Sequence, residues 1–217
     1  MRDQEVTSTE IEKAIQLGRD SQRHWGTLTH KERGRTLLEL GRQLEDRADD
    51  LMVVILEDTG KPRLEALSSE LLSVIELLRY YSKNSARILK PRRIGISTMV
   101  PHKVSKKVFL PLGVVGIISP WNFPFSIPMG ETLTALFAGN SVILKPSECT
   151  PKISHWIKEF FAKSPLPENL VQVFEGAVDT GRALVSSSVD KILFTGSVET
   201  GRKIGAACAQ VLKPCSL

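Results

Sequence analysis

From Pro111 onward, the chain alternates short apolar runs with segments of helical pattern. Four runs rich in β-branched residues lie in this half, at residues 114–118, 141–145, 170–174 and 191–195. Runs of this length and composition are typical of strands that are buried on both faces of a parallel sheet. The helical segments between them predict βαβ units with right-handed crossovers. We therefore expect residues 111–217 to form a parallel α/β sheet domain.

The first 90 residues are expected to be helical. Ser8 or Thr9 is a candidate N-cap for the first helix. Thr29, with Glu32 three residues later, has the capping-box pattern of a second helix. A later apolar run ends at Gly60, which is typical of a helix C-terminus.

Residues 91–110 break this pattern. Val104 and Val108 are separated by lysines, which predicts a partly exposed, two-stranded hairpin. The chain therefore divides into a helical part at 1–90, a hairpin at 91–110 and an α/β domain at 111–217.

Composition excludes several classes of protein. The 217 residues are 41% hydrophobic and 24% charged, as in a globular chain with its own core. No run approaches the roughly 18 apolar residues of a membrane span, and the polar N-terminus lacks the apolar core of a secretory signal. Cys149, Cys208 and Cys215 form no C-x-x-C pair, so neither a disulfide framework nor a metal site is expected. We expect a cytoplasmic protein.

Positive charge is concentrated between Glu76 and Glu131. This interval holds nine lysines and arginines and no acidic residue, in a chain of net charge +5. Clustered basic residues can bind nucleic-acid phosphates. The interval carries no nucleic-acid motif and little aromatic interleaving, so we favour a solvated or subunit-facing surface.

In parallel α/β sheets, ligands bind outside the carboxyl ends of the strands. The turn after the second predicted strand carries Lys145 and Glu148, a cation and a carboxylate that can hydrogen-bond to ribose hydroxyls. A local ion pair in a surface turn is the simpler interpretation of this tetrapeptide taken alone.

The turns after the first and the fourth predicted strands also contain candidate binding residues. Asn122, bracketed by aromatic residues and prolines, could donate from a rigid amide to an oxyanion, although alone it fits ordinary turn chemistry. Gly196 and Ser197 follow a strand and open a predicted helix whose amides could meet a phosphate. Their surroundings match neither a dinucleotide G-x-G-x-x-G nor a P-loop, because Arg202 and Lys203 replace the P-loop lysine and hydroxyl residue.

Together the three turns resemble the NAD(P)-dependent aldehyde dehydrogenase superfamily. The segments GVVGIISPWNFP, AGNSVILKPSE and ILFTGS, in this order, carry the resemblance. It extends over nearly the whole chain through Trp25, Arg33 and the DTGKP segment at residues 58–62. The resemblance implies a partial aldehyde dehydrogenase fold, with N-terminal helices and a β-hairpin leading into a Rossmann-like parallel sheet.

The resemblance also implies a chemistry. In that family a cysteine thiolate adds to an aldehyde, hydride passes to NAD(P), and the thioester is hydrolysed to a carboxylic acid. Asn122 matches the oxyanion asparagine. The implied cofactor-binding residues are Ile118, Trp121, Lys145, Glu148, Gly196 and Ser197. The Glu148 carboxylate should repel a 2′-phosphate, so NAD is expected over NADP. An aldehyde and a homo-oligomeric partner are implied, without nucleic acid or membrane.

The resemblance places the family's general-base glutamate and nucleophilic cysteine beyond Leu217. Cys149, Cys208 and Cys215 have no evident base beside them and are interpreted as inert. We expect the chain alone to lack turnover and to expose apolar faces and a sheet edge. The alternative is a short, non-catalytic NAD-binding or subunit-interaction module.

Overall fold

The computed structural model describes residues 6–95, 99 and 103–217. Helices form its first part, followed by a two-stranded antiparallel hairpin. The bounds in this part are α1 (Ser8–Thr27), α2 (His30–Asp46), α3 (Ala48–Thr59), α4 (Arg63–Glu65), the π-helix η1 (Ala66–Leu72), α5 (Ser73–Ile88), β1 (Arg92–Ile94) and β2 (Ser105–Lys107).

The rest of the described chain alternates strands and helices. Its elements are β3 (Val114–Ile118), α6 (Ser126–Phe137), β4 (Ser141–Lys145), α7 (Pro151–Ala162), β5 (Val171–Val173), α8 (Val178–Ser186), β6 (Lys191–Phe194), α9 (Val198–Gln210) and β7 (Cys215–Ser216). The strands pair in parallel in the order β5-β4-β3-β6-β7. This confirms the predicted α/β fold class.

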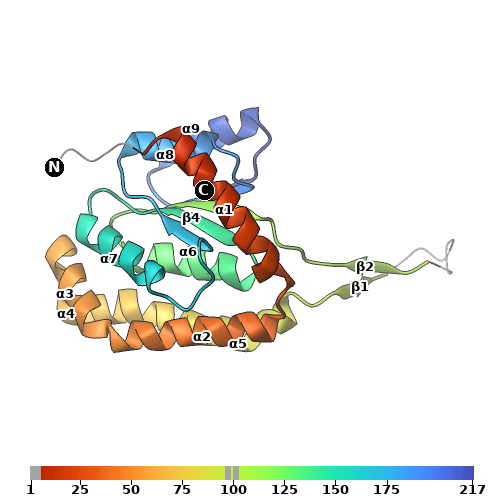
Figure 1. Ribbon diagram of the computed structural model, residues 1–217, viewed down its shortest axis with the longest axis horizontal. Helices are drawn as coiled ribbons and strands as arrows, with labels where there is room; N and C mark the ends of the chain where they lie inside the picture. Colours follow the sequence, from red (N-terminus) through yellow and green to blue (C-terminus); the bar gives the residue numbers. More distant parts are fainter. Residues whose placement is uncertain (1–5, 96–98, 100–102) are drawn as a thin grey trace.

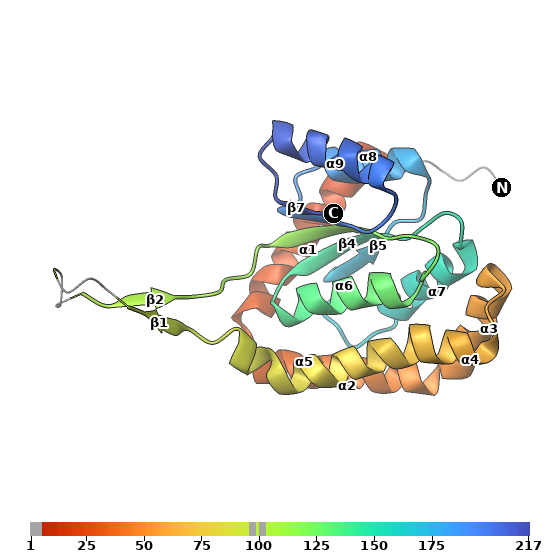
Figure 2. The same ribbon diagram turned by 180° about the vertical axis from the view of Figure 1, so that it is seen from behind.

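Helices cover both faces of the sheet. Successive side chains of a strand point to opposite faces, and the central strand shows the consequence. Val115 and Ile117 pack in the core with α2, α5, α6 and α7, whereas Val114 and Ile118 pack with α1, α8 and α9. Figures 1 and 2 show α6 and α7 next to one face with α2–α5 outside them, and α8 and α9 on the opposite face.

Close helix packing explains a glycine in the middle of β3. A Cβ atom on Gly116 would lie 2.9 Å from Ile192 Cδ1 and 3.3 Å from the Leu184 side chain. A larger residue would therefore press against the side chains of Ile192 in β6 and Leu184 in α8.

Two helix starts test the capping predictions. Thr29 is confirmed as the N-cap of α2, because its hydroxyl accepts from Glu32 N at 3.2 Å. The prediction for α1 is wrong: Thr7, rather than Ser8 or Thr9, is the N-cap. A capping box needs a glutamate three residues after the cap, and Glu10 stands at that spacing only from Thr7, whose N–H it accepts at 2.8 Å.

The hairpin extends away from the body of the molecule (Figure 2). Its strands pair with Arg92 opposite Lys107 and Ile94 opposite Ser105, and nearly all their side chains are exposed. Val104 and Val108 flank β2 rather than lying in it. Among the helices of the described residues, none is apolar over a length sufficient to cross a membrane.

Candidate functional site

A cavity of about 760 Å³ lies at the carboxyl ends of β3, β4 and β6. Parallel strands bring their carboxyl ends to one edge of a sheet, so the turns after these three strands meet there. Residues of α8 and α9 also line the cavity. All seven residues predicted from the sequence line it, namely Ile118, Trp121, Asn122, Lys145, Glu148, Gly196 and Ser197.

Lys145 and Glu148 line the cavity with two charged side chains. Lys145 is the last residue of β4 and is only 5% exposed, whereas the Glu148 side chain is 42% exposed. Lys145 Nζ donates to Glu148 Oε2 at 2.5 Å. The strand ends are held together here, since Ser119 N donates to the Lys145 carbonyl at 3.2 Å. The pair is thus an ion pair with a buried cation and a carboxylate that stays accessible.

Charge on Glu148 is favoured despite its partial burial. Burial raises the pKa of this carboxyl, but the hydrogen bond and the charge of Lys145 act in the opposite direction. The net pKa of Glu148 is below its ordinary value. The cavity therefore carries a carboxylate at neutral pH.

Asn122 lies in the turn between β3 and α6. Its Oδ1 accepts from the N–H of Phe123 at 3.1 Å. This contact uses the amide oxygen locally and leaves the NH₂ group, which has no hydrogen-bond acceptor among the described residues. The side chain is exposed at the cavity wall. The NH₂ group thus keeps two N–H donors that no described residue uses.

Gly196 and Ser197 immediately precede α9. Ser197 is the N-cap of this helix, and its hydroxyl accepts from Thr200 N at 3.2 Å. A Cβ atom on Gly196 would lie 2.5 Å from the Phe194 ring, so a larger residue would clash with that ring. The first amides of a helix lack intrahelical partners and carry partial positive charge. This end of α9 can therefore accept an anionic group.

Sequence reasoning missed the walls that α8 and α9 contribute. Val178 and Val185 of α8 and Ile204 and Ala207 of α9 add apolar surface to the cavity. Both helices begin with related sequences, GAVDTGR at residue 176 and GSVETGR at residue 196. This internal similarity was the signal that could have linked them, because it predicts two equivalent helix starts at one sheet edge.

A second acidic group lies just behind the cavity. Glu131 Oε1 of α6 accepts from the hydroxyl of the cavity residue Thr195 at 2.8 Å. Its Oε2 atom is buried and has no hydrogen-bond partner among the described residues. Burial raises the pKa of Glu131, and the Thr195 hydrogen bond offsets only part of that effect.

The raised pKa of Glu131 predicts a pH-dependent stability. Above its ordinary pKa of 4.5, the unfolded chain loses this proton while the folded chain keeps it, which favours unfolding. The stability of the wild type relative to Glu131→Gln should therefore be greatest near pH 4 and fall as pH rises through the raised pKa. Urea unfolding at several pH values measures this difference.

The Thr195→Val variant sharpens this test, because removing the hydrogen bond should raise the pKa of Glu131 further. A stability difference between wild type and Glu131→Gln that is flat or rises with pH would contradict the prediction.

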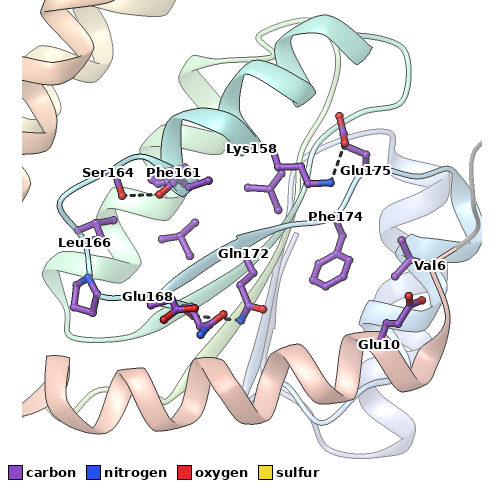
Figure 3. A pocket seen from close by; sticks show the side chains of 15 residues that line it. Val6, Glu10, Lys158, Phe161, Ser164, Leu166, Glu168, Gln172, Phe174 and Glu175 are labelled. Carbon is purple, nitrogen blue, oxygen red and sulfur yellow. Dashed lines mark hydrogen bonds and ion pairs between the residues drawn. The ribbon is translucent and has the colours of Figure 1, made fainter.

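A separate cavity of about 820 Å³ lies between the start of α1, α7 and the edge strand β5 (Figure 3). None of the predicted site residues lines it. Its charges are mixed, and Lys158 is already paired with Glu175 at 3.2 Å. Gln172 donates to the carbonyls of Ala14 and Asn169. The Gln172 side chain thus joins α1 to the edge strand β5.

The three cysteines differ in exposure. Cys149 is exposed, Cys208 is buried and Cys215 is half-buried, and none lines the cavity at the strand ends. Burial raises the pKa of the Cys208 thiol, and the neighbouring Cys215 raises it further. Within the described residues, no cluster of three or more acidic, histidine or cysteine side chains could hold a metal ion.

Comparison with known proteins gives a consistent result. The aldehyde dehydrogenase family model matches residues 2–217. The 4,4'-diapolycopene aldehyde oxidase of Methylomonas sp is 42% identical over 181 residues, which cover 83% of this chain and 34% of that protein. The chain therefore spans about a third of the length of this curated relative.

Solved structures share the fold. The NAD⁺ complex of an aldehyde dehydrogenase from Bacillus cereus matches with a TM-score of 0.88 at 29% identity, over 97% of this chain and 43% of that one. AldH of Staphylococcus aureus, in a substrate-bound state, matches with a TM-score of 0.88 at 25% identity, over 94% of this chain and 44% of that one. This chain belongs to the aldehyde dehydrogenase family.

Proposed function

We propose that residues 1–217 form the cofactor site and part of the oxyanion site of an enzyme that oxidises an aldehyde to a carboxylic acid with NAD. The observation that carries this proposal is the convergence of the three turns. Residues separated by up to 79 positions in the sequence, from Ile118 to Ser197, line one cavity at the sheet edge.

The residues of the cavity suit a dinucleotide. The Glu148 carboxylate would accept hydrogen bonds from ribose hydroxyls, and the start of α9 would face a phosphate. The apolar side chains of α8 and α9 would pack against a flat base. When bound, NAD supplies the acceptor for the hydride of the aldehyde.

Asn122 would act on the substrate rather than on the cofactor. Its NH₂ group would donate to the oxygen of the aldehyde as negative charge develops there. Such a donor stabilises the transition state more than the ground state and so lowers the barrier.

Direct titration of this chain with NAD⁺ by calorimetry tests the cofactor part of the proposal. Saturable one-to-one binding is expected. A folded chain that does not bind NAD⁺ would contradict it.

We expect this chain to prefer NAD⁺ over NADP⁺ by roughly tenfold in affinity. The Glu148 carboxylate would lie beside the ribose, and repulsion of a 2′-phosphate near the surface costs on the order of 1–2 kcal/mol. Glu148→Gln should bring the two dissociation constants together. Calorimetric titrations of the wild type and of Glu148→Gln, each with NAD⁺ and with NADP⁺, measure the ratio of the two dissociation constants.

Glu159→Gln is a matched control for this prediction. Glu159 is a carboxylate of α7 that does not line the cavity. Its side chain is 45% exposed, close to that of Glu148, and it also pairs with a lysine, Lys163, at 3.4 Å. The cofactor ratio of this control should equal that of the wild type. If the ratio of the NADP⁺ and NAD⁺ dissociation constants is the same in Glu148→Gln as in the wild type, Glu148 is excluded as the source of the preference for NAD⁺.

A second candidate function is a non-catalytic module that binds NAD or another subunit. It is favoured by the position of the cysteines, since none lines the cavity beside Asn122. The intact mass of the native protein that carries this sequence distinguishes the two functions. A species much heavier than 24.0 kDa that reduces NAD⁺ with an aldehyde supports the enzyme, whereas a folded species near 24.0 kDa that binds NAD⁺ without turnover supports the module.

We also propose the hairpin as a contact between subunits. Several apolar side chains around it are exposed, and they lie on a segment that extends from the body of the molecule (Figure 2). They include Ile94, Val104, Val108, Phe109 and Leu110. Exposed apolar patches of this kind mark interaction sites.

The Methylomonas relative suggests diapolycopene aldehyde as the first substrate to assay.

A further inference from the structure

A fully buried carboxylate lies beneath the turn that carries Asn122. Glu70 belongs to the π-helix η1 and is 0% exposed. A glutamate is almost never buried to this extent unless its charge is compensated. π-helical turns are rare and frequently occur at functional sites. The partners of Glu70 therefore need an explanation.

The Glu70 carboxylate binds the start of α6. Its Oε2 accepts from the backbone N–H of Phe125 at 3.2 Å and from that of Ser126 at 2.8 Å. Phe125 is the N-cap of α6 and its side chain makes no capping hydrogen bond. Glu70, which is 55 residues away in the sequence, thus supplies the acceptor that this helix start lacks. Its negative charge also suits the positive end of the helix.

Lys61 completes the contact. Its Nζ donates to Glu70 Oε1 at 2.5 Å and lies 4.0 Å from the centre of the Phe123 ring. A cation over an aromatic face is a favourable contact, and it is stronger where water is excluded. Together Lys61 and Glu70 contact Phe123, Phe125 and Ser126, which are three of the four residues that follow Asn122.

We propose that Glu70 is a positioning residue for Asn122. Glu70 holds the amides of Phe125 and Ser126, and this contact fixes the backbone of the turn before α6. The backbone of the turn in turn sets the position of the Asn122 NH₂ group at the cavity. This inference rests on the proposed function, because it requires Asn122 to act in catalysis. It predicts that Glu70 affects the rate of reaction without contacting substrate or cofactor.

Glu70→Gln and Glu70→Ala test the inference in a complete enzyme that carries this chain. Misplacing a catalytic group by about 1 Å can cost roughly 100-fold in rate, so kcat should fall about 10- to 100-fold in Glu70→Ala. Glu70→Gln keeps one acceptor oxygen and should recover part of this loss. The Kd for NAD⁺ and the KM for the aldehyde should change by less than about threefold.

Asp58→Ala is the matched control. Asp58 also lies in the N-terminal helices and accepts from a backbone N–H at the start of a helix, Ile153 N of α7, at 2.9 Å. Its loss should lower stability in the same way but leave kcat unchanged. Equal kcat losses in Asp58→Ala and Glu70→Ala would reduce Glu70 to a purely structural role and overturn the inference.

A double variant separates this inference from the proposed function. If Glu70 acts through Asn122, Glu70→Gln should lower kcat by less than about threefold in an Asn122→Ala background. Full additivity of the two losses would overturn the inference and leave the proposed function intact. An Asn122→Ala enzyme with wild-type kcat would overturn both.

Hydrogen exchange on this chain gives a test that is independent of activity. Exchange of the Phe125 and Ser126 amides should accelerate in Glu70→Gln, whereas that of the Ile153 amide should not. Unchanged protection of the first two amides in Glu70→Gln would contradict the inference even if the Glu70→Ala chain did not fold.

Discussion

Asn122→Ala should lower the kcat of a complete enzyme carrying this chain by about 10²–10³-fold, the usual effect of removing one oxyanion donor. The side chain lies at the cavity wall with its oxygen bound to Phe123 N, so its NH₂ group is the part that can reach the substrate. Because the donor acts on developing charge, the aldehyde KM should change much less than kcat. Steady-state kinetics measure both constants.

An affinity measurement and a control variant show whether a loss of kcat in Asn122→Ala comes from the missing amide rather than from a damaged fold. The affinity of residues 1–217 for NAD⁺ should be the same in Asn122→Ala and wild type, which shows that the cavity is intact. Asn84→Ala is the matched control, since Asn84 is a half-buried asparagine of α5 that binds the Tyr80 carbonyl and Arg87 and does not line the cavity. A drop in kcat of less than about threefold in Asn122→Ala would exclude the oxyanion role.

Trp25→Ala should lower the free energy of unfolding of this chain by about 3–5 kcal/mol, the range for removing a large buried aromatic side chain. The Trp25 indole is 1% exposed, and its Nε1 donates to the Leu136 carbonyl at 2.9 Å. The substitution removes this hydrogen bond and leaves a cavity between α1 and α6. Urea unfolding followed by circular dichroism measures the loss.

Trp25→Phe and Trp121→Ala serve as controls for the stability prediction. Trp25→Phe keeps most of the ring volume and should cost less than Trp25→Ala. Trp121 is 62% exposed, so its replacement by alanine should change stability by only about 0.5 kcal/mol or less. Similar losses in Trp25→Ala and Trp121→Ala would contradict the role given to Trp25.

Both predictions concern the same helix, because the N-terminal helices hold α6 at its two ends. At the C-terminal end of α6, Trp25 Nε1 donates to the Leu136 carbonyl and Arg33 Nε donates to the Phe137 carbonyl at 3.2 Å. At its start, Glu70 binds the amides of Phe125 and Ser126. The Trp25 and Arg33 pattern, seen in the sequence only as a resemblance, thus has a physical role in placing the helix behind Asn122.

The sequence by itself determined which three turns meet at the cavity. Strands rich in β-branched residues, separated by helices, form a parallel sheet, and a parallel sheet brings the turns after its strands to one edge. For this reason the sequence alone predicts that Asn122, Lys145 and Gly196 lie together. Helix caps such as Thr29 were equally accessible, because a capping box depends only on residues three apart.

Only the tertiary structure decided what lies around these turns. The contact of Glu70 with Phe125 and that of Trp25 with Leu136 join residues 55 and 111 positions apart. No local pattern encodes such contacts, because they form only when separate helices pack on the sheet. The two-residue strand β7 was missed because it is too short to show a period and exists only through pairing with β6. Local spacing therefore specified the turns, whereas packing between distant segments specified how rigidly they are held.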